Sequence, residues 1–142
     1  INKNWDSTNS SILGGKSLVL SSSRITLGNG TVSLGATTYT NLVAGSTIVA
    51  TIEFAIDTSV NTPVDVNGDV QITDGTSTVV AAKTYEDDNS VRRMETIVGS
   101  AIFTSVDPVA VKTFTVNYLN HQSATVHTMS GKHIVLHIRE YI

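Results

Sequence analysis

The chain of 142 residues has no cysteine, two prolines, one tryptophan and only 15% charged residues. Without cysteine there can be no disulfide framework, no thiolate metal site and no cysteine nucleophile. Nine basic against twelve acidic residues give a net charge of −3, and no basic cluster is available to neutralise the phosphates of a nucleic acid. No apolar run approaches the roughly 20 residues of a membrane span. We therefore expect neither a nucleic-acid partner nor a membrane partner.

What the chain does contain is the composition of half-buried strands. Its apolar residues make up 40% of the total and are mostly Val, Ile, Ala and Leu, diluted by many Ser, Thr and Asn residues. β-Branched residues are favoured in strands, and no stretch places apolar residues at the 3.6-residue spacing of a helix. The length predicts a single domain, and the pattern predicts that it is all-β.

The first 15 residues are polar and irregular, and they include the only tryptophan, Trp5. We interpret residues 1–15 as an N-terminal arm and residues 16–142 as the domain. A large amphipathic ring on a polar arm is typical of an interface anchor, so Ile1 and Trp5 are the residues expected to attach the arm to a partner. A disordered terminus is the alternative.

The clearest alternation of apolar and polar residues lies between Ser46 and Asp57. A period of two indicates a strand with one face in the core. The opposite face is also fairly apolar, with Glu53 as its only charge, which predicts a central strand with material packed on both sides. The expected core residues of this strand are Ile48, Ala50, Ile52, Phe54 and Ile56.

Asp74-Gly75 separates two strand-like runs, residues 70–73 and 78–82, and predicts a hairpin. The acidic residues at 65, 69, 74 and 86–88 do not follow the ligand spacing of a calcium-binding EF-hand loop. Asp beside Gly is explained by turn conformation. We therefore interpret these carboxylates as turn and surface groups.

Glycines predict two further features. Gly28-Asn29-Gly30 predicts a hairpin between strands at residues 24–27 and 31–34. In the strand expected over residues 94–104, Gly99 predicts a bulge or a bend.

The last 32 residues are typical of three strands joined by tight turns. The strands are expected over residues 111–119, 124–128 and 133–142, with Ser130-Gly131 as the second turn. The whole chain then holds about eight to ten strands, which favours a two-sheet antiparallel jelly-roll sandwich. An immunoglobulin-like sandwich is the alternative.

This closing block resembles the tumour-necrosis-factor-like jelly roll, above all the versions found in bacteriophage virion proteins of the capsid-decoration and head-fibre type. The resemblance covers about 35 residues and has no diagnostic motif. The residues that carry it are Phe114, Val116 and Tyr118, then Ser123-Ala124-Thr125-Val126, then Ile134 to Glu140.

The resemblance implies a homotrimer in which the final strand lies in the middle of an inner sheet facing the threefold axis. On that strand, Ile134, Leu136 and Ile138 are expected in the core. Their neighbours would then face another subunit, as would the outward faces of residues 48–56 and 111–119. The expected trimer-interface residues are Val135, His137, Arg139, Tyr141 and Tyr118.

No arrangement of residues predicts catalysis. Serine is abundant, but no nucleophile elbow, no assignable triad and no phosphate-binding glycine loop occurs. His133 and His137 are about 13 Å apart on a strand, too far to chelate one ion within a subunit. A metal or anion held by His137 on a threefold axis is the alternative to a packing role. We expect no enzyme activity and no cofactor.

The leading functional hypothesis is a trimeric capsid decoration (cement) protein. It would bind the major capsid protein on the outer surface of the virion, using residues 1–15, and stabilise the shell. The alternative is a receptor- or carbohydrate-binding tip domain of a phage fibre or spike, with a host-surface glycan as partner. Sugar recognition usually needs exposed aromatic rings, and the candidates for this role are Trp5, Tyr39 and Tyr85.

Overall fold

The computed structural model describes residues 12–22, 25–26, 30–40, 42–58, 66–86, 94–104, 111–121 and 129–142. Within these ranges it is built from strands, and it contains no helix long and apolar enough to span a membrane. The nine strands are β1 (Ile12–Ser21), β2 (Ile25–Thr26), β3 (Gly30–Thr40), β4 (Thr47–Thr58), β5 (Val66–Thr73), β6 (Thr78–Glu86), β7 (Met94–Phe103), β8 (Val111–Asn120) and β9 (Met129–Tyr141).

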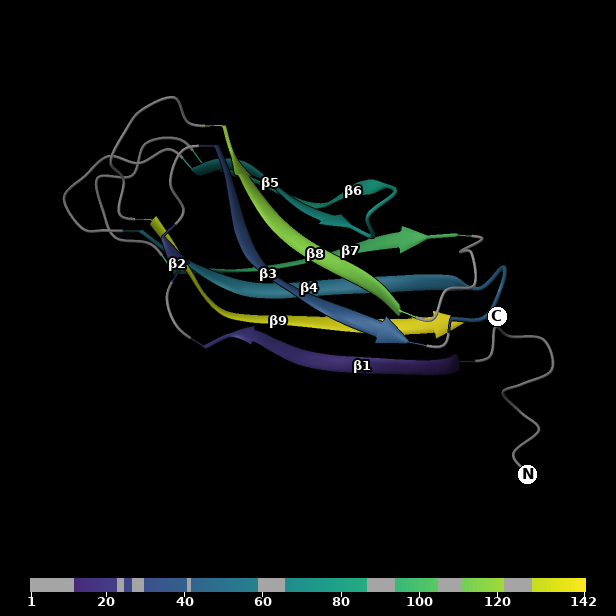
Figure 1. Ribbon diagram of the computed structural model, residues 1–142. Coiled ribbons are helices and arrows are strands. Elements are labelled where there is room, and N and C mark those ends of the chain that lie inside the picture. Colours follow the sequence, from purple (N-terminus) through teal and green to yellow (C-terminus); the bar gives the residue numbers. More distant parts are fainter. Residues whose placement is uncertain are drawn as a thin grey trace, which may run out of the picture.

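The strands form two antiparallel sheets that pack face to face (Figure 1). Sheet A has the order β1-β9-β4-β7, with the short β2 beside β9, and sheet B has the order β3-β8-β5-β6. Strands close in sequence are therefore often in different sheets, and β9 lies between β1 and β4. This is the strand order of a jelly roll, so the predicted all-β, two-sheet jelly-roll sandwich is confirmed.

The core fills the space between the inner faces of the two sheets. On β4 the predicted alternation is confirmed, since Ile48, Ala50, Ile52, Phe54 and Ile56 are all buried. Sheet B supplies the facing layer, in which the rings of Phe103 from sheet A and Phe114 from β8 meet edge to face at 5.6 Å. The remaining large buried side chains in the described ranges are Leu34, Leu42, Val70, Ile72, Val116, Tyr118, Ile134, Leu136 and Ile138.

Strand β4 is central, as predicted, because it pairs with β9 on one side and β7 on the other. Its second face, however, lies on the outside of the sandwich, where Glu53 is exposed. Packing within the chain therefore does not explain why this outer face of β4 is fairly apolar.

Two predicted turns are wrong. Strand β2 pairs with β9 in sheet A while β3 pairs with β8 in sheet B, so the strands on either side of residues 28–30 do not form a hairpin. Ser130 and Gly131 lie inside β9, opposite Thr26 and Ile25. Glycine marks a place where the chain can turn, but it does not say whether the chain returns to the same sheet. The strand expected over residues 124–128 lies outside the described residues.

Gly99 also differs from its prediction. Strand β7 pairs with β4 over ten consecutive residues without a register shift, so Gly99 makes no bulge. It is required by a close approach between the sheets, because a Cβ at this position would lie 2.3 Å from the carbonyl oxygen of Ala81 on β6. The hairpin predicted around Asp74-Gly75 is confirmed, with Thr73 opposite Thr78.

The irregular point of β9 is His133, which has a φ of 54°. Its neighbours are displaced by a register shift against β4 between Glu53 and Ala55, and by another against β1 between Val19 and Ser21. A bulge of this kind increases local twist. Beyond it the alternation is regular to Tyr141.

Candidate functional site

The outward-facing side chains of sheet A form one continuous surface, here called the outer face of sheet A. The strand register places them in rows that cross from β1 through β9 and β4 to β7. Three successive rows are Val19, Val135, Glu53 and Val98; then Ser17, His137, Thr51 and Ser100; then Gly15, Arg139, Val49 and Ile102.

Large apolar side chains on this face are open to solvent. Val98 is 60% exposed, Ile102 58% and Val19 56%. Among the described side chains of the face, only Glu53 and Arg139 carry a formal charge. An apolar surface with polar surroundings is typical of a protein interaction site. The face therefore has the chemistry of a contact that the single chain leaves unmade.

The opposite surface, the outer face of sheet B, is different in character. Its side chains alternate with the buried residues of β3, β5, β6 and β8, and most are hydroxyl or amide groups. Val80 and Val111, 42% and 55% exposed, are its large exposed apolar residues in the described strands. The polar members are Thr31, Ser33, Thr38, Thr40, Asp69, Gln71, Thr73, Thr78, Lys83, Thr113, Thr115 and Asn117. This face suits water rather than a partner.

A row of polar groups crosses the middle of the outer face of sheet A. Ser17 Oγ and His137 Nδ1 are hydrogen bonded at 2.8 Å, and Thr51 Oγ1 and Ser100 Oγ at 2.9 Å. No carboxylate within the described ranges is hydrogen bonded to His137, so the Ser17–His137 contact lacks the orienting acid of a catalytic triad. The polar groups of this row are hydrogen bonded to one another, which leaves the valine and isoleucine side chains of the rows on either side as the contact surface.

The predicted interface residues divide into two groups. Val135, His137, Arg139 and Tyr141 all lie on the outer face of sheet A, because Ile134, Leu136 and Ile138 point into the core. Whether they contact another subunit stays a prediction. The prediction that Tyr118 lies at the interface is wrong, because its side chain is fully buried in the core between the two sheets.

The error over Tyr118 has a clear origin. Its hydroxyl is hydrogen bonded at 2.8 Å to Thr84 Oγ1, and burial raises the pKa of Tyr118. An aromatic ring with a polar tip can fill a core as well as an interface. Strand β8 also belongs to sheet B, so the predicted grouping of residues 111–119 with Tyr141 in one interface is wrong as well.

The sequence interpretation missed Val19, Val98 and Ile102 as members of the outer face of sheet A. The available signal was their alternation with inward residues, Ala101 and Phe103 in the case of Ile102. What the sequence lacked was the strand order that brings β1 and β7 into the same sheet as β9.

Part of the predicted arm belongs to the sandwich. Strand β1 begins at Ile12, and Gly14 and Gly15 pair with Glu140 and Arg139 of β9, so residues 12–15 belong to sheet A. The anchor residues Ile1 and Trp5 lie outside the described residues, as do Arg92 and Arg93. Residues 12–15 were therefore wrongly assigned to the arm.

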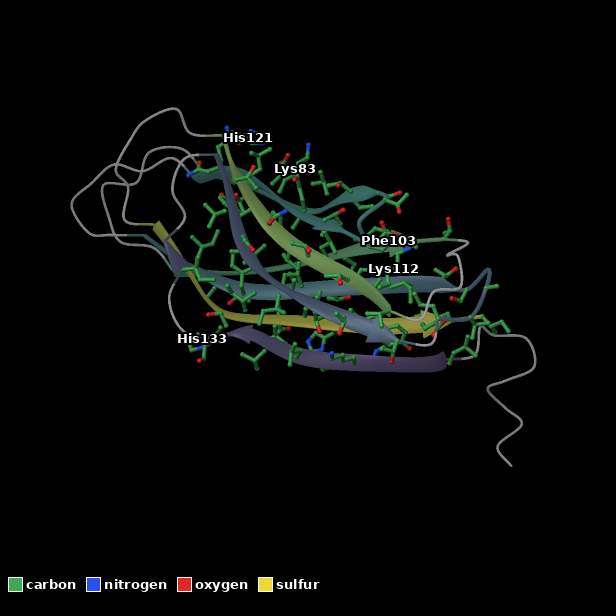
Figure 2. The ribbon with its side chains drawn as sticks, in the orientation of Figure 1. Lys83, Phe103, Lys112, His121 and His133 are labelled. Atoms are coloured by element: carbon green, nitrogen blue, oxygen red, sulfur yellow. The ribbon has the colours of Figure 1, made fainter. Side chains whose placement is uncertain are left out.

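Several titratable groups outside this face have structural partners. His121 Nε2 lies 3.1 Å from Asp69 Oδ2, and His121 and His133 lie on opposite sides of the sandwich (Figure 2). In the described part of the chain no three acidic or histidine side chains come together in a way that could hold a metal ion. Asp74 Oδ1 accepts hydrogen bonds from the backbone N–H groups of Thr76 and Ser77, as its turn interpretation requires.

Glu140 is a buried carboxylate that the sequence interpretation missed. It points between the sheets from β9, is 2% exposed, and accepts hydrogen bonds from Ser46 Oγ and the Val43 N–H at 2.7 Å and from Tyr39 Oη at 3.2 Å. Burial, and then the hydrogen bond to Glu140 and its charge, raise the pKa of Tyr39, so the phenol remains a donor. The group fixes the turn before β4 to the end of β9.

Comparisons with known proteins identify no family for the chain. No protein-family model matches the chain, and no curated protein matches it. Among solved structures, dimeric latent PorU from Porphyromonas gingivalis is similar over 95% of this chain and 14% of its own length, with a TM-score of 0.48 and 9% sequence identity. The chain thus spans about one seventh of the length of that protein.

Proposed function

We propose that this chain is a virion structural protein, a homotrimeric decoration (cement) protein that binds the major capsid protein on the outer capsid surface and stabilises the shell. The observation that carries the proposal is the contrast between the two outer faces of the sandwich. The outer face of sheet A exposes more than half of Val19, Val98 and Ile102 beside a row of polar groups, and the outer face of sheet B is covered mostly with hydroxyl and amide groups.

The position of β9 supports the same assignment. In the phage domains that the sequence resembles, the final strand lies in the middle of the inner sheet, and here β9 lies between β1 and β4. Its outward residues Val135, His137, Arg139 and Tyr141 follow the centre of the face that a trimer would bury. Closed symmetric association is the usual way to cover such a face.

A decoration protein works by mass action. A ligand that binds only the assembled shell stabilises that shell by an amount that grows with its concentration. Three linked copies bind several shell subunits at once, which raises the apparent affinity without any new contact. This function needs no catalytic group, and Ser17–His137, the one serine–histidine contact among the described residues, has no acid to complete it.

The alternative, a carbohydrate-binding tip domain, is less well supported. Tyr39 lies in β3 and directs its hydroxyl to the buried Glu140, so it is not an exposed platform for a sugar ring. Tyr85 lies in β6 and not in a loop. The side chains of Tyr85 and Trp5 lie outside the described residues.

The proposal is tested with purified protein and with capsids that lack it. Multi-angle light scattering should give three times the mass of the chain, 15.1 kDa, or a whole multiple of that trimer mass, and the protein should co-sediment with the capsids. Deleting residues 1–11, which leaves β1 intact, should abolish co-sedimentation without changing the number of chains in the oligomer or the melting temperature. Trp5→Ala provides the matched single substitution. A stable monomer, or a trimer that ignores capsids, would contradict the proposal.

A further inference from the structure

Strand β7 is an edge strand without the usual protection. It pairs with β4 on one side only, and at the border of sheet A no other described strand is hydrogen bonded to it (Figure 1). Its ten pairs with β4 show no bulge, and from Thr96 to Thr104 the sequence has no charge and no proline. Natural proteins avoid long, regular, uncharged edges because such edges recruit other strands.

The other edge strands of the sandwich carry the protection that β7 lacks. Strand β1 has register shifts at both ends, and Lys16 reaches from it to the carbonyl oxygen of Thr38 at 2.9 Å. Strand β3 has a bulge next to Gly35. Strand β6 has a register shift opposite Val70 and carries the exposed Lys83. Among the four edge strands compared, β7 is therefore the one without a bulge or a charged side chain along residues 96–104.

The sequence of β7 is complementary to itself. If a second β7 runs antiparallel to the first with Ser100 opposite Ser100, every pair matches in size and polarity. Antiparallel neighbours interact through such directly opposed side chains. The pairs are Thr96 with Thr104, Ile97 with Phe103, Val98 with Ile102, and Gly99 with Ala101.

We propose that two copies of this chain associate through β7, antiparallel and centred on Ser100, so that the two A sheets become one continuous sheet. Main-chain hydrogen bonds supply the affinity, and Val98 of each copy lies against Ile102 of the other. Both side chains are more than half exposed in the single chain, at 60% and 58%. A twofold contact of this kind uses the same surface on both partners.

This inference does not rest on the proposed function. A trimer would bury the outer face of sheet A, whereas this pairing uses its edge. A protein that does both is a hexamer, and one that pairs only through β7 is a dimer. Mass measurement thus separates the failure of one proposal from the failure of the other.

The absence of cysteine in the chain allows a direct test. Directly opposed residues of an antiparallel pair have Cα atoms about 4.5–5.5 Å apart, within the roughly 4.4–6.8 Å range of disulfides. The variant Ser100→Cys, at an exposed position, should therefore oxidise to a covalent dimer visible on a non-reducing gel. Thr113→Cys, at an exposed position on the outer face of sheet B, is the control. This variant should run as single chains on the same gel.

A second experiment tests the register. Val98→Cys and Ile102→Cys should each cross-link poorly alone, since each faces the other residue in the partner. Mixed together they should cross-link about tenfold faster, because pairing raises the effective concentration of the two thiols. Equal rates for mixed and single variants, or no dimer with Ser100→Cys at a concentration where the protein is folded, would overturn the proposal. So would a wild-type mass of one or three chains.

Discussion

Among the charged residues of the described ranges, Glu140 is the most deeply buried, at 2% exposed, and it accepts three hydrogen bonds. Its carboxylate holds three parts of the fold at one end of the sandwich: β3 through Tyr39, the turn through Val43 and Ser46, and β9 through its own backbone. All three partners are neutral donors. A buried carboxylate is tolerated when both of its oxygens are hydrogen bonded in this way.

The substitution Glu140→Gln should destabilise the protein. The amide keeps the shape but offers one acceptor oxygen, and its NH₂ group faces donors that then lack a partner. Leaving a buried donor unsatisfied costs about 1–3 kcal/mol. Urea unfolding measures the loss, with Glu53→Gln on the exposed outer face as the control. Equal stability of the two variants would show that the Glu140 network contributes nothing.

Asp74 makes stability depend on pH. Burial opposes its ionisation, but the backbone N–H groups of Ser77 and Thr76, together with Lys112 at 3.0 Å, outweigh burial and hold its pKa below the ordinary value. A carboxyl whose pKa is lowered by folding stabilises the protein above its unfolded pKa, and this contribution is lost as pH falls through the folded pKa.

We therefore expect Asp74→Asn to be less stable than the wild type at pH 7. The difference in the free energy of unfolding should shrink below the ordinary carboxyl pKa of about 4, because the wild-type group then becomes neutral too. Urea titrations of both proteins between pH 7 and pH 2.5 measure this. A difference that is constant across the range would show that the charge of Asp74 is not involved.

At the scale of elements, the contact between β6 and β7 depends on a missing side chain. Gly99 lets the carbonyl oxygen of Ala81 approach its Cα, and a methyl group there would meet backbone at 2.3 Å and the Ala82 side chain at 2.7 Å. Since backbone cannot yield as a flexible side chain does, the two sheets would have to separate locally.

Gly99→Ala should accordingly cost about 1–3 kcal/mol, the usual penalty of overpacking. Ser100→Ala, at the exposed neighbouring position, should leave the free energy of unfolding within about 0.5 kcal/mol of the wild type. Thermal and urea denaturation of the two variants give the comparison. A stabilising Gly99→Ala would mean that the approach of β6 to β7 is looser than described.

The same elements show how far a sequence pattern reaches. Alternation identified the buried faces of β4 and β9, because burial of one face imposes a period of two on any half-buried strand. Asp74-Gly75 identified the β5–β6 hairpin, because the two strands that pair there are neighbours in the sequence. The sheet to which each strand belongs depends on pairing between distant residues, and so β2, β8 and Tyr118 were misplaced.

The candidate site was predictable only in part for the same reason. His137 and Arg139 could be placed on an outward face from β9 alone. Val98, Ile102 and Val19 join them only because β7 and β1 lie in sheet A. Glu140 gave no signal at all, since its position fits the inward set of β9 but its residue type does not.

At the scale of the whole molecule, the two outer faces predict different responses to charge. Val135→Asp places a carboxylate in the apolar row beside Glu53 and should dissociate a trimer built on this face. Burying an unpaired charge costs several kcal/mol. Thr115→Asp, in the middle of the outer face of sheet B, should leave the trimer intact. Light scattering and circular dichroism measure mass and fold, and equal behaviour of both variants would contradict this use of the face.

The position of β9 between β1 and β4 also bears on how the chain reaches its fold. Ser17 and His137, which share a hydrogen bond across β1 and β9, are 120 residues apart in the sequence. As the chain is synthesised, β1 and β4 exist long before the strand that joins them, and both present unpaired edges until then. Long-range pairing of this kind slows folding and leaves strand edges open to other chains. The arrival of β9 therefore sets the time during which a nascent copy is at risk of pairing with the wrong neighbour.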